Sequence, residues 1–246
     1  MCLKRLDKFL AEAGGLTRSE AKKECRKKTV TVNGRIISSP DEKIDPDTDE
    51  ICLQGKRLSY EENHYYMLNK KAGYITATED GSQKTVLDLL HLSLPETKKQ
   101  KLFPVGRLDK DTEGLLLITD DGPLSHELLA PKKHVEKTYF VRVDGPLCEA
   151  DAAAFEEGMD IGEKKILKPA GLEILSSEEE ALVTISEGKF HQIKRMFEKR
   201  GRKVLYLKRI SMGSLKLDEG LAVGEARPLQ KEEISELKKK MEEKNS

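Results

Sequence analysis

One acidic side chain, Asp109, lies in a charged turn just before an unbroken apolar run. The run covers residues 115–118 and is bounded by Gly114 and by Asp120-Asp121-Gly122, a pattern that predicts a buried strand. A carboxylate at the mouth of such a strand has a rigid backbone and one side open to a cleft, which suits a nucleophile or a general base. The alternative is a turn-capping aspartate, because Asp commonly hydrogen-bonds its local backbone.

Two further segments carry residues that could work beside this carboxylate. Tyr139 opens a strand after Glu136-Lys137-Thr138, where a tyrosine can also be plain core packing. Lys194 lies at the edge of an apolar stripe in residues 187–197 and can reach into a cleft. A half-buried cation beside a carboxylate stabilises the ionised form of that carboxylate. His191, in the same segment, is interpreted as a structural histidine.

The N-terminal segment predicts a small unit of two helices followed by a sheet. Leucines recur at helical spacing from Leu3 until Gly14-Gly15, and Thr17-Arg18-Ser19-Glu20 is a capping-box pattern that opens a second helix to about residue 28. Residues 29–32 and 35–37 read as strands joined by an Asn33-Gly34 hairpin turn, with another short strand at residues 50–53. The second helix carries a basic face, which is either solvated surface or a binding surface.

Beyond a polar linker, a larger domain begins at Tyr65. Its strands and helices alternate without a regular βαβ rhythm, which favours an α+β fold with a mixed or antiparallel sheet. Strands are predicted at residues 138–143, 181–186 and 204–210, and helices at residues 151–157, 189–200 and 231–244. The domain boundaries are therefore predicted as 1–58, a linker 59–64, and 65–246.

Charge is balanced overall but unevenly distributed. The 246 residues contain 44 basic and 44 acidic side chains, yet residues 1–35 hold ten Lys or Arg against four acids, and residues 188–210 hold nine against one. Both segments could bind phosphates. The four cysteines form no CxxC pair, so we expect reduced thiols and no zinc site. Without a signal-peptide core or a long apolar run, the sequence predicts a cytoplasmic protein without a membrane span.

The three motifs together resemble the pseudouridine synthases, in the branch that modifies ribosomal RNA and carries an S4 RNA-binding domain. The signature around the family's catalytic aspartate is similar to residues 106–116, its tyrosine motif to residues 136–139, and its third motif to residues 187–196. The run 190–197 most resembles the small-subunit (16S) type. Residues 3–55 resemble an S4 domain. One departure is Lys71, where the family often has proline, and its absence should loosen the backbone there.

The resemblance implies that the N1–C1′ bond of a uridine is broken, the uracil rotates, and it rejoins through C5. No metal or cofactor is implied, because nothing is oxidised and nothing is lost. Asp109 would attack C1′ or take a proton from C2′, Lys194 would keep it ionised, and Tyr139 would stack on the uracil. Ile193 and Leu108 would line the pocket, and Arg107 would position the turn or a phosphate. The residues expected to bind RNA are Arg5, Lys8, Arg18, Ser19, Lys22, Lys23, Arg26, Arg35, Arg195, Lys208 and Arg209.

The implied partner is ribosomal RNA or a pre-ribosomal particle, bound by a monomer, and the target base must leave its stack to reach the pocket. Three alternatives stay open. A non-catalytic RNA-binding or ribosome-assembly protein could keep the domain without the activity. A glycoside hydrolase also works at an anomeric carbon, but it needs a second carboxylate at a defined distance. The large-subunit (23S) enzyme of the same branch is the nearest rival.

Overall fold

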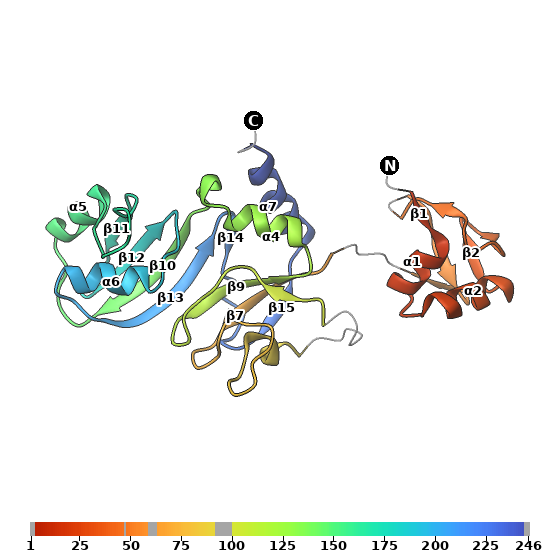
Figure 1. The fold of residues 1–246 in the computed structure, drawn as a ribbon, viewed down its shortest axis with the longest axis horizontal. Coiled ribbons are helices and arrows are strands. Elements are labelled where there is room, and N and C mark those ends of the chain that lie inside the picture. Colours follow the sequence, from red (N-terminus) through yellow and green to blue (C-terminus); the bar gives the residue numbers. More distant parts are fainter. Residues whose placement is uncertain (1–2, 47, 59–62, 92–99, 244–246) are drawn as a thin grey trace. The chain divides into compact units, whose positions relative to one another are not determined.

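The computed structural model describes residues 3–46, 48–58, 63–91 and 100–243. The chain divides into two compact units, with the division between residues 62 and 63. Most of the predicted linker, residues 59–62, lies outside the described residues, and Asn63 and His64 begin the second unit. Figure 1 shows the ribbon of both units. The N-terminal unit contains one cluster of buried hydrophobic residues and the second unit contains two.

The N-terminal unit pairs two helices with short strands. Its elements are β1 (Lys4–Arg5), α1 (Leu6–Ala13), α2 (Arg18–Arg26), β2 (Val30–Val32), β3 (Arg35–Ile36), β4 (Lys43–Ile44), β5 (Ile51–Leu53) and β6 (Lys56–Arg57). β3, β2, β5 and β6 form one antiparallel sheet, and β1 pairs with β4. The first helix begins at Leu6 rather than Leu3, because the preceding residues form β1 and leave Leu3 exposed.

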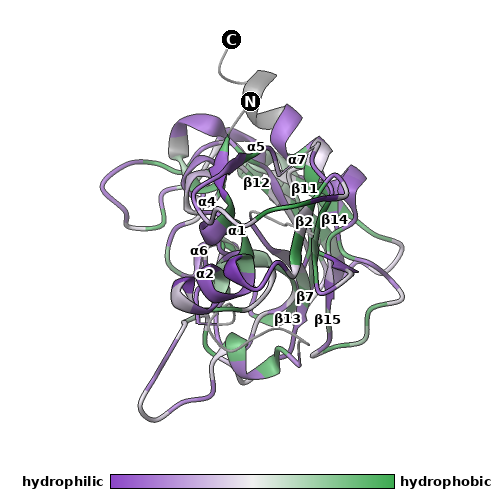
Figure 2. Cartoon of the chain, turned by 90° about the vertical axis from the view of Figure 1, so that its right-hand side faces the viewer, coloured by the Kyte–Doolittle hydropathy of each residue, from purple (hydrophilic) through white to green (hydrophobic). Residues whose placement is uncertain are grey.

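Helix α2 begins with the predicted capping box. The Thr17 side chain accepts a hydrogen bond from the Glu20 amide, and the Glu20 carboxylate accepts one from the Thr17 amide. The pair satisfies two amides that a helix start would otherwise leave free. Ala21 and Cys25 face the core, and the other side of the helix is hydrophilic (Figure 2).

The second unit is built on one mixed sheet. The strands are β7 (Tyr65–Lys70), β8 (Phe103–Pro104), β9 (Glu113–Thr119), β10 (Lys137–Val143), β11 (Gly171–Ile174), β12 (Glu180–Ile185), β13 (Val204–Met212), β14 (Leu215–Lys216) and β15 (Ala226–Pro228). The main path is β11-β12-β10-β13-β9-β7-β15, with β14 beside β13 and β8 beside β9. β13 and β9 run parallel and the other pairs antiparallel, so the predicted α+β fold with a mixed sheet is confirmed.

Helices cover different faces of this sheet. They are η1 (Val86–Leu89), α4 (Gly122–Leu129), η2 (Pro131–Lys133), α5 (Glu149–Glu157), α6 (Gln192–Lys199) and α7 (Lys231–Glu243). α5 and α6 lie beside β10–β12, and α4 and α7 lie toward the β7 and β9 half (Figure 1). The predicted helix 189–200 is shorter than expected, because His191 has the left-handed backbone conformation (φ 50°) and caps α6.

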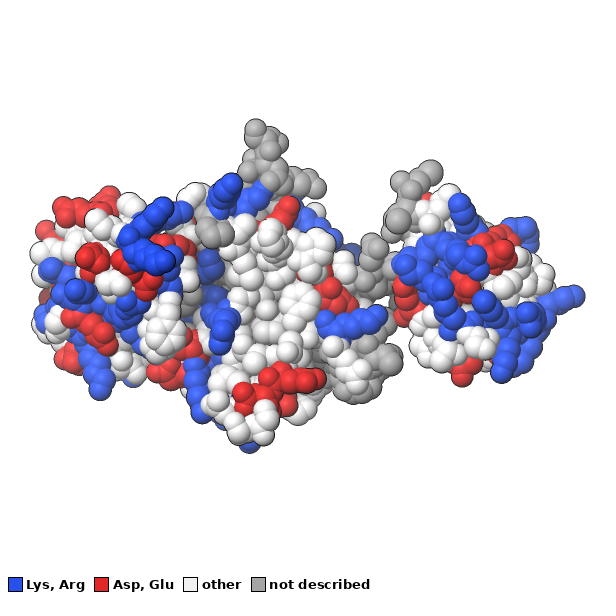
Figure 3. Space-filling view, viewed as in Figure 1, with Lys and Arg blue, Asp and Glu red and all other residues white. Residues whose placement is uncertain are grey.

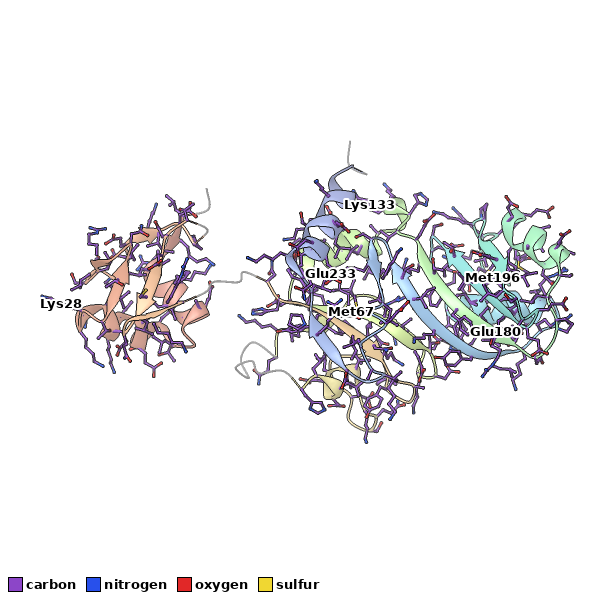
Figure 4. The ribbon with its side chains drawn as sticks, turned by 180° about the vertical axis from the view of Figure 1, so that it is seen from behind. Lys28, Met67, Lys133, Glu180, Met196 and Glu233 are labelled. Carbon is purple, nitrogen blue, oxygen red and sulfur yellow. The ribbon has the colours of Figure 1, made fainter. Side chains whose placement is uncertain are left out.

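The apolar run that the sequence singled out is the centre of two cores. Leu116 and Ile118 pack on one face of β9, and Leu115 and Leu117 pack on the other. Because both faces of β9 are buried, the run lacks the alternation of apolar and polar residues that a half-exposed strand has. Burial of each such side chain contributes about 1.5–3 kcal/mol. Met196 of α6 and Met67 of β7, labelled in Figure 4, lie in the first and second core respectively. The turn before β9 is therefore attached to a strand that is buried on both faces.

Candidate active site

The Asp109 turn enters β9 through a glycine that cannot be replaced without strain. Gly114 has φ +97°, and a Cβ at this position would lie 2.2 Å from the carbonyl oxygen of Arg209. The close approach arises because Gly114 and Arg209 are partners in the parallel pair of β9 and β13. Any side chain there would separate the two strands, so this glycine fixes where the turn meets the sheet.

A buried lysine holds the turn from beneath. Lys70 ends β7, is fully buried, and its Nζ donates to the carbonyl oxygens of Asp109 (3.0 Å), Lys110 (3.2 Å) and Thr112 (2.7 Å). Burial lowers the pKa of Lys70 to about 8. The carbonyls of the turn thus converge on one cation, which restricts the main chain that carries Asp109. The sequence analysis did not assign a role to Lys70.

A second clamp fixes the residue before the aspartate. The Thr76 hydroxyl donates to the Leu108 carbonyl (2.7 Å) and accepts a hydrogen bond from the Leu108 amide (3.1 Å). The Gly73 amide donates to the Lys110 carbonyl (2.7 Å). The segment around Lys71, where the family often has proline, is therefore held to the turn by hydrogen bonds, and the expected loosening of its backbone is not observed.

Asp109 is paired with the predicted lysine. Lys194 Nζ lies 3.2 Å from Asp109 Oδ2 and 2.6 Å from Asp111 Oδ1. Burial opposes the charged ammonium, but the hydrogen bonds to Asp111 and Asp109 outweigh it and raise the pKa of Lys194 above its ordinary value. Burial also opposes the Asp111 carboxylate, yet the bond from Lys194 leaves the pKa of Asp111 lowered. Lys194 is thus a stable cation bridging two carboxylates.

His191, interpreted from the sequence as a structural histidine, lies beside Asp109. Its Nε2 lies 3.7 Å from Asp109 Oδ1, and its ring stacks on Phe190 with centroids 3.8 Å apart. Phe190 is 74% exposed, so it does not belong to the apolar stripe that its spacing suggested. The left-handed backbone at His191 turns both rings away from the core side of α6. No signal in the sequence indicated this conformation.

These residues line one cavity of about 720 Å³, a size suited to a small organic ligand. Tyr139, Leu108 and Ile193 supply a buried apolar wall, and Arg107 and Asp109 lie on the same lining. The structure thus brings together the six residues predicted for catalysis and the pocket: Arg107, Leu108, Asp109, Tyr139, Ile193 and Lys194. The cavity offers a carboxylate, a paired cation and an apolar wall, which suits attack on a sugar whose planar base packs against that wall.

The residues predicted to bind RNA fall into three groups. On α2, the side chains of Arg18, Lys22, Lys23 and Arg26 are exposed and form no hydrogen bond or ion pair with another described residue, and Ser19 is exposed beside them. Figure 3 shows the Lys and Arg side chains gathered on this N-terminal unit. Arg5, Lys8 and Arg35 are also exposed but pair with acids, namely Asp7, Glu12 and Glu42.

The basic residues of the larger unit differ from expectation. The Arg195 guanidinium binds Glu163 and the carbonyls of Ile161 and Phe190, so the predicted phosphate contact is not supported for it. Arg209 is 1% exposed and lines the cavity, and it cannot meet RNA at the outer surface. Lys208 is half-buried on β13. Arg209 is the register partner of Tyr139, so its burial follows from the pairing of β10 with β13.

Comparison with known proteins identifies the larger unit. Residues 64–199, more than half of the chain, match the family described as RNA pseudouridylate synthase. The chain belongs to the RNA pseudouridylate synthase family. Residues 4–51 match the S4 domain, so the predicted resemblance is confirmed for both parts. As a pseudouridine synthase, the protein is an isomerase that carries an S4 domain.

Relatives match over nearly the full length. The chain is 46% identical to the ribosomal small subunit pseudouridine synthase A of Pasteurella multocida, covering 96% of this chain and all of the relative. It is 42% identical to the protein of that name in Escherichia coli (94% and 98%). It is 45% identical to the uncharacterized RNA pseudouridine synthase YtzG of Bacillus subtilis (94% and 96%). A solved structure titled "Crystal structure of pseudouridylate synthase" is 44% identical, with a TM-score of 0.66 over 95% and 99% of the chains.

No helix in the part of the chain that the structure describes is long and apolar enough to cross a bilayer. No group of three or more His, Cys, Asp or Glu side chains with the arrangement of a metal site occurs among those same residues.

Proposed function

We propose that the protein converts a uridine of small-subunit (16S) ribosomal RNA to pseudouridine, with Asp109 as the residue that acts on the sugar. The observation that carries the proposal is the pairing of Asp109 with Lys194 at 3.2 Å in a cavity walled by Tyr139. The choice of small-subunit RNA is supported by relatives of 42–46% identity that bear that name. The large-subunit alternative has no such support among these relatives.

In this proposal each residue of the cavity has one task. The Asp109 carboxylate attacks C1′ or removes the C2′ proton of a uridine that has left its stack. Lys194 keeps that carboxylate ionised, and the Lys70 clamp keeps its backbone in place. Tyr139 stacks on the uracil while Leu108 and Ile193 pack against it, and Arg107 positions the turn or a phosphate. No oxidant or reductant enters, because the reaction exchanges one bond of the base for another.

The exposed cations of the N-terminal unit would supply the RNA affinity. The side chains of Arg18, Lys22, Lys23 and Arg26 form no hydrogen bond or ion pair with another described residue, so they can bind phosphates without breaking one. Their contacts would offset the few kcal/mol that removing a base from its stack requires. We further propose that the protein acts as a monomer, in the cytoplasm, on ribosomal RNA or a pre-ribosomal particle.

The test is a pseudouridine map of ribosomal RNA from a strain that lacks the gene, read by carbodiimide-dependent primer stops. The proposal predicts that one stop in 16S RNA disappears and returns when the intact gene is restored. Loss of a stop in 23S RNA would overturn the choice of substrate. An unchanged map would favour the non-catalytic RNA-binding alternative. A glycoside hydrolase would need a second carboxylate across the cavity. The other carboxylate of the lining, Glu187, accepts a hydrogen bond from the Lys168 amide, and Asp111 is bonded to Lys194.

A further inference from the structure

Several cations that the proposed reaction does not use line the same cavity as Asp109, and two of them lie beside Tyr139. These two are Lys137 of β10 and Arg209 of β13. Arg209 is the register partner of Tyr139, and Lys137 precedes Tyr139 by two residues on the same strand. Because strand side chains alternate between faces, all three project to the cavity side of the sheet. Two positive charges therefore lie next to the tyrosine that would hold the uracil.

Neither cation has a counter-charge within the described part of the protein. Lys137 Nζ donates to the Val135 carbonyl (2.8 Å), and Arg209 Nε donates to the Leu115 carbonyl (2.7 Å). Arg209 Nη2 is buried and has no hydrogen-bond partner among the described residues. Burial and the repulsion from Arg209 lower the pKa of Lys137 to about 8. Burying two cations side by side without a carboxylate is unfavourable, because each loses hydration and they repel one another. A bound anion would relieve both costs.

The carboxylates of the cavity lining are already engaged elsewhere. Asp109 is paired with Lys194, and Glu187 accepts a hydrogen bond from the Lys168 amide (2.8 Å). Among the described residues, neither carboxylate forms an ion pair with Lys137 or Arg209. The missing anion must therefore come from outside the described chain.

We propose that Lys137 and Arg209 form an internal anion site that binds a phosphodiester group flanking the uridine in the cavity. The inference rests on the proposed function, since uracil and ribose are neutral and the phosphodiesters are the anionic groups of the RNA beside them. A cavity of about 720 Å³ has room for a nucleotide and not only for a base. Arginine presents paired donors that match phosphate oxygens, and Arg209 has a donor to spare.

The test compares the binding of uridine, uridine 5′-monophosphate and uridine 3′-monophosphate to the full chain by calorimetry at fixed ionic strength. We expect one of the two nucleotides to bind about 10- to 100-fold more tightly than uridine. Lys137→Met should remove most of this advantage and leave the affinity for uridine unchanged. Lys137→Arg should restore it, and Lys216→Met, a change of an exposed lysine on β14, should retain it.

Equal binding of uridine and both nucleotides by the unchanged protein would overturn the anion site. So would a Lys137→Met protein that keeps its preference for the nucleotide. Circular dichroism of each variant establishes that it is folded, and rescue by arginine separates a charge effect from a packing effect. These outcomes are distinct from failure of the proposed function, which would appear as an RNA that the unchanged protein does not isomerise.

Discussion

Two cations near Asp109, Lys70 and Lys194, bind other groups of the protein, whereas the side chains of the cations on α2 bind none in the described part of the chain. Lys70 is fully buried and donates to the carbonyls of the Asp109 turn, and Lys194 bridges Asp109 and Asp111. On α2, by contrast, Lys22 and Arg26 are exposed without an ion pair among the described residues. Lys70 and Lys194 organise the protein's own groups, whereas the exposed cations of α2 remain available to an external polyanion.

This difference indicates how to separate catalysis from RNA affinity. A buried, bonded cation has one fixed geometry, so its loss should change the rate or the stability. An exposed cation acts through long-range attraction, so its loss should change affinity and salt dependence.

Removal of the cation beside Asp109, the proposed catalytic carboxylate, should have a large effect on the rate. Lys194→Met should lower the single-turnover rate at saturating RNA by about 100-fold or more, because Asp109 loses its electrostatic partner. Lys194→Arg should recover part of the rate. The affinity for RNA should stay within about threefold, as measured by filter binding in the same buffer. A rate within about threefold of the unchanged protein would show that the pair does not assist the reaction.

Removal of the Lys70 side chain should loosen the turn that carries Asp109. Lys70→Met leaves the carbonyls of Asp109, Lys110 and Thr112 without their buried donor, and we expect the free energy of unfolding to fall by about 2–4 kcal/mol. Hydrogen exchange followed by mass spectrometry should show faster exchange of the β9 amides, while the N-terminal unit is unchanged. Unaltered protection of β9 would mean that the clamp contributes nothing to holding the site.

The lowered pKa of Lys70 makes stability depend on pH. In the folded protein Lys70 loses its proton near pH 8, whereas in the unfolded chain it keeps it until about 10.5, so the unfolded state binds more protons in between. Stability of the second unit should therefore rise between pH 8 and 10, by about 1–2 kcal/mol from this group. Urea unfolding at the two pH values measures it. In Lys70→Met the rise should be smaller by that amount; an equal rise would contradict the assignment.

Neutralisation of the α2 cations should act on affinity alone. The triple change Lys22→Gln, Lys23→Gln and Arg26→Gln should weaken RNA binding several-fold. The slope of log K against log salt concentration should become less steep by about 0.7–0.9 for each phosphate that is no longer neutralised. The single-turnover rate at saturating RNA should not change. Lys56→Gln, an exposed lysine of β6, is the matched control and should have little effect. A salt dependence equal to that of the unchanged protein would place the RNA elsewhere.

Much of this organisation could be predicted from sequence. The apolar run before Asp120 predicted the buried strand, the capping box predicted the start of α2, and the three motifs predicted the site around Asp109. These features are local: each depends on the spacing of neighbouring residues. They also carry the resemblance that the family comparison confirmed.

The interactions that depend on tertiary structure could not be predicted. Lys70 looks like a charged strand end until β7 pairs with β9 and brings it beneath the turn. Phe190 has the spacing of a core residue, but the left-handed His191 removes it from the helix face. Arg209 looks like a surface phosphate ligand, and only the register with Tyr139 places it inside the cavity. In each case a partner distant in sequence or an unusual backbone conformation decides the role.

The role of Asp109 is tested by comparing Asp109→Asn with Asp111→Asn on the same ribosomal RNA. Both carboxylates contact Lys194, but of the two only Asp109 lines the cavity. We expect Asp109→Asn to abolish pseudouridine formation and retain RNA binding, whereas Asp111→Asn should keep most of the activity. Pseudouridine formation by Asp109→Asn at a rate similar to that of the unchanged protein would show that Asp109 is not the residue that acts on the sugar.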